Sequence, residues 1–244
     1  MTSRPTITLI TPTADQPTGL ALAERYVTRQ TMPPDQWLVA DDGTVPATLT
    51  LGQTHLKRKR AGEGAASLAG NLMAAIPHAT GDIIIIWEHD DWYPADFLAT
   101  CVAHLSRPGV WITGTRRQRY YHLPSRRWIV MRNVGSALCN TALRAEALPI
   151  LALAASSAAR AGSYGIDRRL WTRIPDNRQH LHDEPGVVGI KGLPGRPGLG
   201  MGHRPDAVAR RQRPWKADPA GATLREWVGE ADAAVYQAIA EGRT

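Results

Sequence analysis

Residues 81–94 read GDIIIIWEHDDWYP, and this stretch decides the fold. The four consecutive isoleucines at 83–86 are typical of a strand that is buried on both faces, as in a parallel sheet. Directly after them stand Glu88, Asp90 and Asp91. In an open α/β sheet, ligands bind beyond the carboxyl ends of the strands. The stretch therefore predicts a central strand that delivers carboxylates to a binding site.

Two similar strand-like runs precede this stretch. Residues 6–10 are β-branched and apolar, and residues 37–40 form a short apolar run that ends at Asp41 and Asp42. Apolar residues at helical spacing lie between the three runs. The alternation of strand and helix predicts a doubly wound, mostly parallel α/β sheet in a single domain. Both acidic clusters then fall at the same edge of that sheet.

The pattern continues with one more helix and is less regular after residue 110. We expect a helix from Pro94, strands near 110–113 and 128–131, and a helix over 139–161. Residues 183–203 are rich in Gly and Pro, which predicts irregular backbone. A last helix is expected from Thr223, which would form a capping box with Glu226.

Composition and charge narrow the class of protein. The 244 residues carry a formal charge of +7, which favours nucleotide or nucleic-acid partners, although an arginine-rich surface alone would give the same number. The apolar stretch at 147–155 is too short to span a bilayer, so we expect no membrane span and no signal peptide. The two cysteines, Cys101 and Cys139, have no metal-ligand spacing and fit a reduced, cytoplasmic setting as packing groups.

Asp90 and Asp91 are the best candidates for a metal site. Two or more carboxylates beyond an apolar strand can hold Mg²⁺ or Mn²⁺, because these cations prefer oxygen ligands and complete their shell with water and phosphate. The alternative is a helix N-cap for the helix expected from Pro94. Glu88, Asp90 and Asp91 together carry more charge than a cap requires, which favours the metal.

The order of several short motifs resembles the family 2 glycosyltransferases of the GT-A fold over about residues 5–205. The motifs are Thr11-Pro12-Thr13, Gln30-Thr31-Met32-Pro33, Asp41-Asp42-Gly43, Asn71, Ala79-Thr80-Gly81-Asp82, Glu88-His89-Asp90-Asp91 and Trp92-Tyr93-Pro94. The resemblance implies a nucleotide-sugar half at 1–110, an acceptor half at 111–205 and a C-terminal extension at 206–244. It also implies a nucleotide-sugar donor, with a UDP-sugar expected, and Mn²⁺ or Mg²⁺ as cofactor.

The resemblance assigns roles on the donor side. Thr11, Pro12 and either Asp41 or Asp42 would contact the nucleoside. Asp90, together with Asp91, would hold the metal on the diphosphate. Glu88 stands where the family more often has Asp, which leaves the direct metal ligand open. Arg60 and Asn71 would bind near the base or diphosphate, or be a solvated cation and a helix-surface amide.

The family also uses a general base, and a further ligand from a C-terminal loop. Asp167 matches the place of the base in chain order, with a helix N-cap as the alternative and Asp176, Asp183 and Glu184 as rivals. His203 follows the Gly-rich run and resembles the further metal ligand, although an isolated histidine is more often structural. The implied reaction is an inverting displacement.

Basic residues form a run at 57–60, and basic and aromatic residues are interleaved in the expected acceptor half. Such surfaces can hold phosphate backbones and stack exposed bases. The residues that we assign to the acceptor are Arg116, Arg117, Arg119, Tyr120 and Trp128. One hypothesis is therefore a DNA acceptor bearing a hydroxymethylated pyrimidine, as in some phage enzymes. A glycan or other small acceptor, solvated loops, and a catalytically silent nucleic-acid-binding module are the alternatives.

Overall fold

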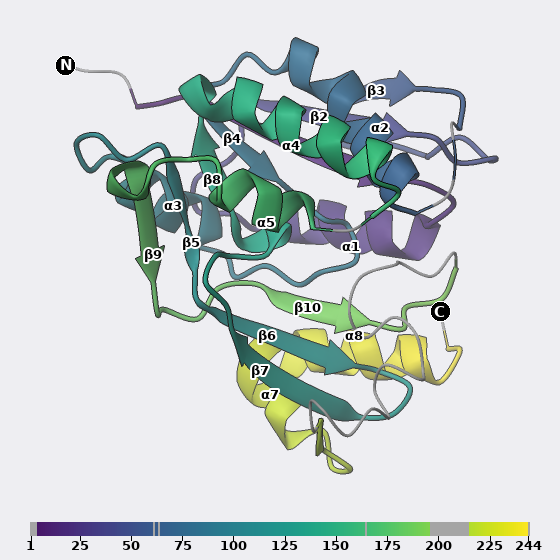
Figure 1. The fold of residues 1–244 in the computed structure, drawn as a ribbon. Helices are drawn as coiled ribbons and strands as arrows, with labels where there is room; N and C mark the ends of the chain where they lie inside the picture. The colour runs from purple at the N-terminus through teal and green to yellow at the C-terminus, as the bar shows by residue number, and fades with distance from the viewer. Residues whose placement is uncertain (1–3, 61, 63, 164, 196–214, 244) are drawn as a thin grey trace.

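The large sheet forms the centre of the molecule. The computed structural model describes residues 4–60, 62, 64–163, 165–195 and 215–243. Within them, seven strands form one sheet in the order β3-β2-β1-β4-β8-β5-β9 (Figure 1). These strands are β1 (Ile7–Thr13), β2 (Gln36–Asp41), β3 (Thr54–Lys57), β4 (Ile83–Ile86), β5 (Ile112–Thr115), β8 (Ala142–Arg144) and β9 (Gln179–His182).

The sheet is parallel except at β8, which pairs antiparallel with both β4 and β5. Helices cover its two faces, and strand alternation decides which side chains meet which helices. Ile83 and Ile85 of β4 pack with α1 (Pro17–Thr28) and α3 (Phe97–Leu105). Ile84 and Ile86 pack with the helices of the opposite face, α2 (Ala65–Ala75), α4 (Leu148–Arg160) and α5 (Ile166–Trp171). The predicted doubly wound α/β fold is thereby confirmed.

A second, smaller sheet lies below the first in Figure 1 and carries the chain's last helices. Its order is β10-β6-β7-β11. Its strands are β6 (Arg117–His122), β7 (Arg127–Arg132), β10 (Val188–Lys191) and β11 (Lys216–Ala217), and the helices are α7 (Ala222–Val228) and α8 (Glu230–Ala240). Trp92, just after the acidic motif, makes a bridge to Val188 of β10. The second sheet is therefore joined to the end of the acidic motif.

Four local predictions were wrong. The helix expected over 139–161 begins only at Leu148, because residues 142–144 form β8 between its two partner strands. The irregular backbone expected over 183–203 includes β10. The helix expected from Pro94 begins at Phe97. The C-terminal helix is broken at Gly229, whose φ of 82° suits glycine, and Gly221 rather than Thr223 caps it.

Helix α8 is held against α1 and the acidic motif by a buried carboxylate. Asp232 is 3% exposed and accepts hydrogen bonds from Trp92 Nε1 at 2.7 Å and from Arg25 Nε at 3.1 Å, and it pairs with Arg29. Beside it, the hydroxyl of Tyr26 donates to that of Tyr236 at 2.6 Å. The last helix thus packs against the body of the domain.

We expect Asp232→Ala to lower the free energy of unfolding by about 3 kcal/mol, because it leaves Arg29 and the Trp92 indole without their shared partner. Burial alone would raise the pKa of Asp232, but hydrogen bonds from Trp92 and Arg29 lower it overall. A lowered pKa stabilises the fold above about pH 4, the ordinary value, and that contribution is lost as pH falls through the folded pKa. In denaturant unfolding, the free energies of unfolding of the wild type and of Asp232→Ala should become more similar as the pH is lowered into the acid range.

The matched control is Glu230→Ala in the first turn of the same helix. The Glu230 side chain is 84% exposed, so its loss should change the free energy of unfolding by less than about 1 kcal/mol. Equal effects of the two substitutions would contradict the bracing role of Asp232.

Candidate active site

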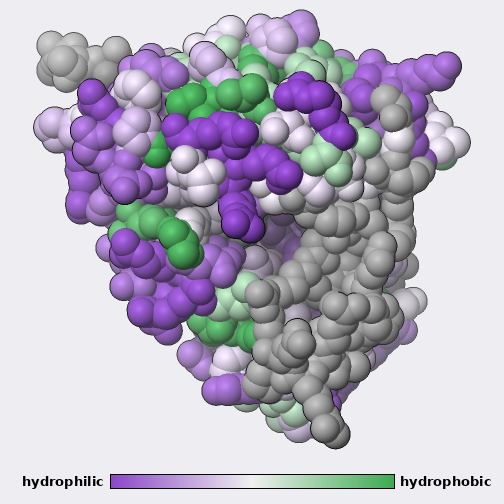
Figure 2. Space-filling view, viewed as in Figure 1, coloured by the Kyte–Doolittle hydropathy of each residue, from purple (hydrophilic) through white to green (hydrophobic). Residues whose placement is uncertain are grey.

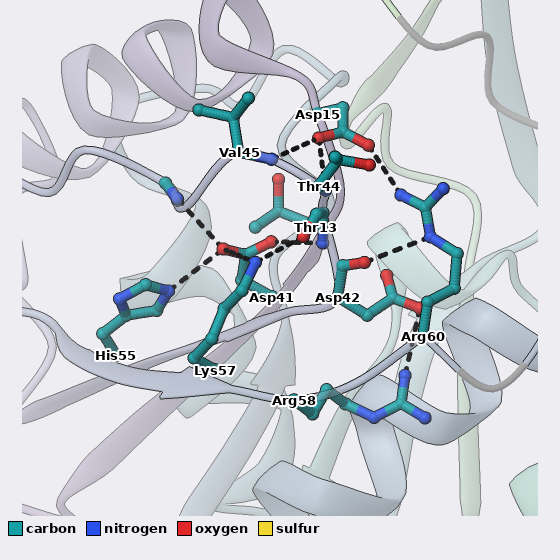
Figure 3. Close-up of polar contacts among 12 residues, drawn as sticks. Thr13, Asp15, Asp41, Asp42, Thr44, Val45, His55, Lys57, Arg58 and Arg60 are labelled. Atoms are coloured by element: carbon teal, nitrogen blue, oxygen red, sulfur yellow. Dashed lines mark hydrogen bonds and ion pairs between the residues drawn. The ribbon is translucent and has the colours of Figure 1, made fainter.

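The loop after β2 is organised around Asp41, which is 1% exposed (Figure 3). Its Oδ1 accepts from the backbone nitrogen of Gly43 at 2.7 Å, and its Oδ2 accepts from that of Ala47 at 3.0 Å. Lys57 and His55, both on β3, reach the same Oδ2 at 3.3 and 3.1 Å. Burial would raise the pKa of Asp41, but these hydrogen bonds lower it overall. An ionised Asp41 therefore fixes the shape of this loop.

Asp42 is equally buried and points toward α2. Its Oδ1 accepts from Ser67 Oγ at 2.8 Å and from Asn71 Nδ2 at 3.2 Å, and its Oδ2 accepts from Arg58 Nη1 at 3.0 Å. Asn71 also donates to the carbonyl oxygen of Thr13 at 3.1 Å. The structure thus brings together Asp42 and Asn71, which we had assigned to the donor. All four oxygens of Asp41 and Asp42 are hydrogen-bonded within the protein.

Arg60 closes this polar cluster on the side of β1. Its Nη2 donates to Asp15 Oδ2 at 2.6 Å and its Nε donates to the carbonyl oxygen of Asp42 at 3.1 Å. The side chain of Thr11 faces inward and accepts from Trp37 Nε1 at 2.9 Å. The carbonyl oxygen of Pro12 lies 3.0 Å from Nδ1 of His89. Through Pro12, the end of β1 contacts the acidic motif.

Aromatic packing sets the turn of the acidic motif, residues 88–91. Trp87 stacks on Tyr93 with ring centroids 3.7 Å apart, and the backbone nitrogen of Glu88 donates to the Tyr93 hydroxyl at 2.8 Å. Both rings are fully buried. This packing leaves Glu88 and Asp90 half-buried at the end of β4.

Asp91 differs from its neighbours because it turns into the protein, toward the second sheet. It is 1% exposed, and its Oδ1 accepts from the backbone nitrogen of Ile190 at 3.1 Å and from Lys191 Nζ at 3.2 Å. The same ammonium lies 3.9 Å from Oδ2 of Asp90, whose side chain is 17% exposed. Burial raises the pKa of Asp91 to about 6, although Lys191 acts in the opposite direction.

The motif offers a donor set that suits a hard divalent cation. Ligand atoms of Glu88, Asp91 and Cys139 lie within 4.8 Å of one another, and Asp90 lies beside them. Burial raises the pKa of Glu88 well above its ordinary value, and the charges of Asp91 and Asp90 raise it further. Burial also raises the pKa of the Cys139 thiol, which leaves carboxylate oxygens as the charged donors. Clustered carboxylates of this kind fit Mn²⁺ or Mg²⁺.

Asp167 lies near the acidic motif, close enough for its charge to act on Glu88. It lies in the first turn of α5, and Gly165 holds the N-cap position, so the N-cap alternative for Asp167 is wrong. Burial raises the pKa of Asp167, and the charge of Asp167 in turn contributes to the raised pKa of Glu88. Its rivals lie elsewhere: Asp176 is on the short helix before β9, while Asp183 and Glu184 directly follow β9. His203 lies outside the described residues.

Strand alternation separates the residues that we assigned to the acceptor. Successive residues of β6 point to opposite faces. Arg119 therefore lies on the same face as Trp128 of β7, and both pack on Trp227 of α7. The guanidinium carbon of Arg119 is 5.4 Å from the ring centroid of Trp227, and the ring centroid of Trp128 is also 5.4 Å from it. Tyr120 lies on the other face, with the ammonium of Lys191 5.7 Å from its ring centroid. Arg116 and Arg117 are exposed.

The structure adds residues that the sequence did not single out as partners of the site. Lys57 and Arg58 belong to a basic run that had the pattern of a phosphate-binding surface, yet they pair with Asp41 and Asp42. The sequence alone showed Lys191 only as a basic residue near the Gly-rich region, whereas in the structure it pairs with Asp91. Figure 2 shows a hollow on the viewed face, between the parts that hold the two sheets, with hydrophilic residues along its upper edge.

A doubly wound sheet with a carboxylate cluster beyond its central strand places the ligand site where such sheets bind ligands, and it is the arrangement that the resemblance to GT-A glycosyltransferases implied. Sequence comparison then gives the family. The family model described as glycosyl transferase family 2 matches residues 8–171. The chain therefore belongs to glycosyl transferase family 2 and is a glycosyltransferase, as the resemblance had implied.

Solved structures share the fold at low sequence identity. The mannosyltransferase PcManGT from Pyrobaculum calidifontis, in complex with GDP-Man and Mn²⁺, is 20% identical with a TM-score of 0.54, and the match covers 99% of this chain and 74% of that one. S. aureus TarS is 11% identical with a TM-score of 0.54, covering 76% and 36%. TarS 1–349 in complex with UDP is 12% identical with a TM-score of 0.52, covering 76% and 60%. No curated protein matches the sequence.

None of the helices in the described part of the chain has the length and apolar character needed to cross a membrane.

Proposed function

We propose that this protein is a metal-dependent, inverting glycosyltransferase that moves a sugar from a nucleoside-diphosphate sugar to an acceptor hydroxyl. One observation carries the proposal: the carboxylates clustered after β4 lie near Asp167, which a separate element, α5, delivers in its first turn. In the proposed reaction, the carboxylate cluster would hold the cation on the diphosphate, and Asp167 would serve the acceptor hydroxyl.

Asp90 is the residue that we assign to the cation, with Glu88 beside it. Asp90 is the more exposed of the two aspartates, whereas Asp91 spends one oxygen on a backbone amide and a buried lysine. When bound, the cation would neutralise the charge that develops on the leaving diphosphate. Lys191 pairs with both Asp90 and Asp91, and its positive charge acts against the rise that burial causes in the pKa of Asp91.

Asp167 is the residue that we assign to the base. A carboxylate oxygen of Asp167 would take the proton from the acceptor hydroxyl as that oxygen bonds to the anomeric carbon. The bond from this carbon to the diphosphate oxygen breaks in the same displacement, and the electron pair leaves with the diphosphate. Attack from the face opposite the leaving group inverts the configuration.

The loop after β2 is our proposed nucleoside site, with Thr11 and Pro12 forming its other wall. Since Asp41 and Asp42 spend their oxygens inside the protein, they would act by holding the loop in place. Arg60 closes this cluster and is partly exposed, so it would be the residue of the loop that reaches a diphosphate. The structure of TarS 1–349 contains UDP and that of PcManGT contains GDP-Man, and both bases belong in a test.

DNA with a hydroxymethylated pyrimidine is one hypothesis for the acceptor, which the half of the chain at 111–205 would bind. Support comes from the net charge of +7 and from the exposed Arg116 and Arg117, where the chain enters the second sheet. Arg119 and Trp128 are already engaged with α7, so they could contribute only after that packing changes. A glycan or another small acceptor is the alternative.

The test is release of nucleoside diphosphate from a panel of UDP- and GDP-sugars with Mn²⁺, with and without hydroxymethylated DNA. We expect release with at least one donor, loss of release with a chelator, and a product of inverted anomeric configuration by NMR. DNA-stimulated release would identify the acceptor class. No release with any donor, together with salt-sensitive DNA binding, would instead identify a silent nucleic-acid-binding module.

A further inference from the structure

Three histidines and a glutamate gather where helix α3 crosses the edge of the large sheet, away from the acidic motif. His104 lies on the buried face of α3, and His180 and His182 lie on the edge strand β9. His180 and His182 point to one face of β9, and Glu184 follows two residues after His182, in the bend that ends the strand. The ring centroid of His104 is 4.8 Å from that of His180 and 4.4 Å from that of His182.

The rings of His104 and His182 are stacked at an interplanar angle of 18°, and polar atoms of this cluster lack the hydrogen bonds that buried groups usually make. His104 is 8% exposed, and its Nε2 has no hydrogen-bond partner within the described part of the chain. That nitrogen lies 3.4 Å from Oε2 of Glu184. Nδ1 of His182 is likewise buried and without a partner among the described residues. One ligand atom from each of these three residues lies within 4.8 Å of the other two.

His180 stands apart from the other two histidines in its contacts. Arg107 lies 3.4 Å from Nδ1 of His180 and can only donate there, because a guanidinium has no acceptor. The other ring nitrogen, Nε2, then carries the proton and has no lone pair to offer. His180 is thus the natural internal control for the cluster.

We propose that His104, His182 and Glu184 form a binding site for Zn²⁺. Two imidazole nitrogens and one carboxylate are a donor set that zinc takes in proteins, with a fourth position open to water or another ligand. Tetrahedral zinc with bonds of about 2.0–2.1 Å holds its ligand atoms about 3.3 Å apart. His104 Nε2 and Glu184 Oε2 already have this separation, at 3.4 Å, and the widest pair of ligand atoms needs to close by at most about 1.5 Å. Because zinc lies in the plane of each imidazole that binds it, the stacked rings of His104 and His182 would also have to turn toward the ion.

The surroundings suit a fourth ligand. A pocket between α3 and the sheet edge is lined by His182 and Glu184, and Thr115 and Asn140 add polar groups to its wall. Water could reach the cation from this pocket. The ion would fasten α3 to β9, an edge strand that pairs only with β5 within the described sheet.

This site is independent of the glycosyl-transfer site. Its donors include two imidazoles, whereas the acidic motif offers carboxylates, and nitrogen ligands favour zinc over Mg²⁺. The two sites also differ in place, since α3 and β9 meet at the edge of the sheet while the motif follows the central strand β4. Excess Mg²⁺ should occupy the acidic motif and leave the histidine site free.

The experiment is calorimetric titration of the tag-free, full-length protein with Zn²⁺ in the presence of excess Mg²⁺. We expect one equivalent to bind, and Co²⁺ in its place to give the visible absorption of a tetrahedral complex. His182→Asn and Glu184→Gln should each weaken binding by about 100-fold, since even the groups that support metal ligands contribute about 10- to 100-fold. Zn²⁺ should also raise the Tm of the wild type.

Two variants serve as matched controls, and a third tests that the site is separate from the acidic motif. His180→Asn and Asp183→Asn make the same kinds of change at residues near His182 and Glu184, and both should keep the wild-type affinity for Zn²⁺. Asp90→Asn should also bind Zn²⁺ normally. No saturable binding by the wild type, equal loss in the controls, or loss in Asp90→Asn would each overturn the proposal. Glu184 is 66% exposed, so Glu184→Gln reports even if His182→Asn fails to fold.

Discussion

The Asp167→Asn variant is expected to lose about 10²- to 10⁴-fold in kcat while its affinity for the nucleotide sugar stays near the wild-type value. Asparagine keeps the size and the hydrogen bond that Oδ1 accepts from the backbone nitrogen of Arg168, at 2.8 Å. It cannot accept the proton from the acceptor. The measurement is steady-state transfer, combined with calorimetric binding of the donor and metal.

The pH profile separates a base from a residue that only supports the fold. Burial raises the pKa of Asp167, and the base works only when it is ionised. Wild-type activity should therefore fall as pH drops toward this raised pKa, at values above the ordinary value of about 3.9. Activity that remains in Asp167→Asn should lack that acidic limb.

Asp176→Asn is the matched control for this prediction, because Asp176 is an exposed aspartate on the short helix that follows α5. It should keep full activity and the wild-type pH profile. Full activity of Asp167→Asn would remove this residue from the mechanism and point to another base.

The second large effect is expected for Asp90→Asn, which should lower kcat/KM by about 10²- to 10³-fold. A bound cation contributes several kcal/mol of charge stabilisation in the transition state, and each 1.4 kcal/mol is a factor of ten. The variant removes a charge from the site but leaves Asp91 in its contact with the Ile190 amide. Mn²⁺ binding, followed by electron paramagnetic resonance with the nucleotide present, should weaken in parallel.

The control is Asp96→Asn, an exposed aspartate that caps α3 without a side-chain hydrogen bond. It should leave both Mn²⁺ binding and turnover unchanged. Wild-type Mn²⁺ affinity in Asp90→Asn would show that Asp91 or Glu88 is the direct ligand instead.

The sequence predicted the centre of the fold well because the deciding signals there are local. Four consecutive isoleucines favour a strand that is buried on both faces of the sheet, and the carboxylates that follow must then lie at the end of that strand. The same reasoning placed Asp41 and Asp42 correctly at the end of β2. The central strands and the position of the acidic motif could thus be predicted without knowing which other segments pack against them.

The misses share one physical cause, which is pairing between segments far apart in the chain. β8 was assigned to a helix because its alanine and leucine residues favour helix, and only its place between β4 and β5 makes it a strand. β10 lay hidden in a Gly-rich region because its partner, β6, precedes it by many residues. Lys57 and Arg58 had the pattern of a surface cluster because β3 lacks a distinctive apolar pattern.

The contact of Trp92 with Asp232 also bears on the order in which parts of the chain fold during synthesis. The two residues are 140 positions apart, so a growing chain can complete the large sheet before the partner of Trp92 has been made. The turn that presents Asp90 would gain its last support only when α8 emerges and docks. Ribosome-bound chains arrested before residue 232 should therefore contain a protease-resistant sheet while the acidic motif is still cleavable. During synthesis, the scaffold would mature before the catalytic turn.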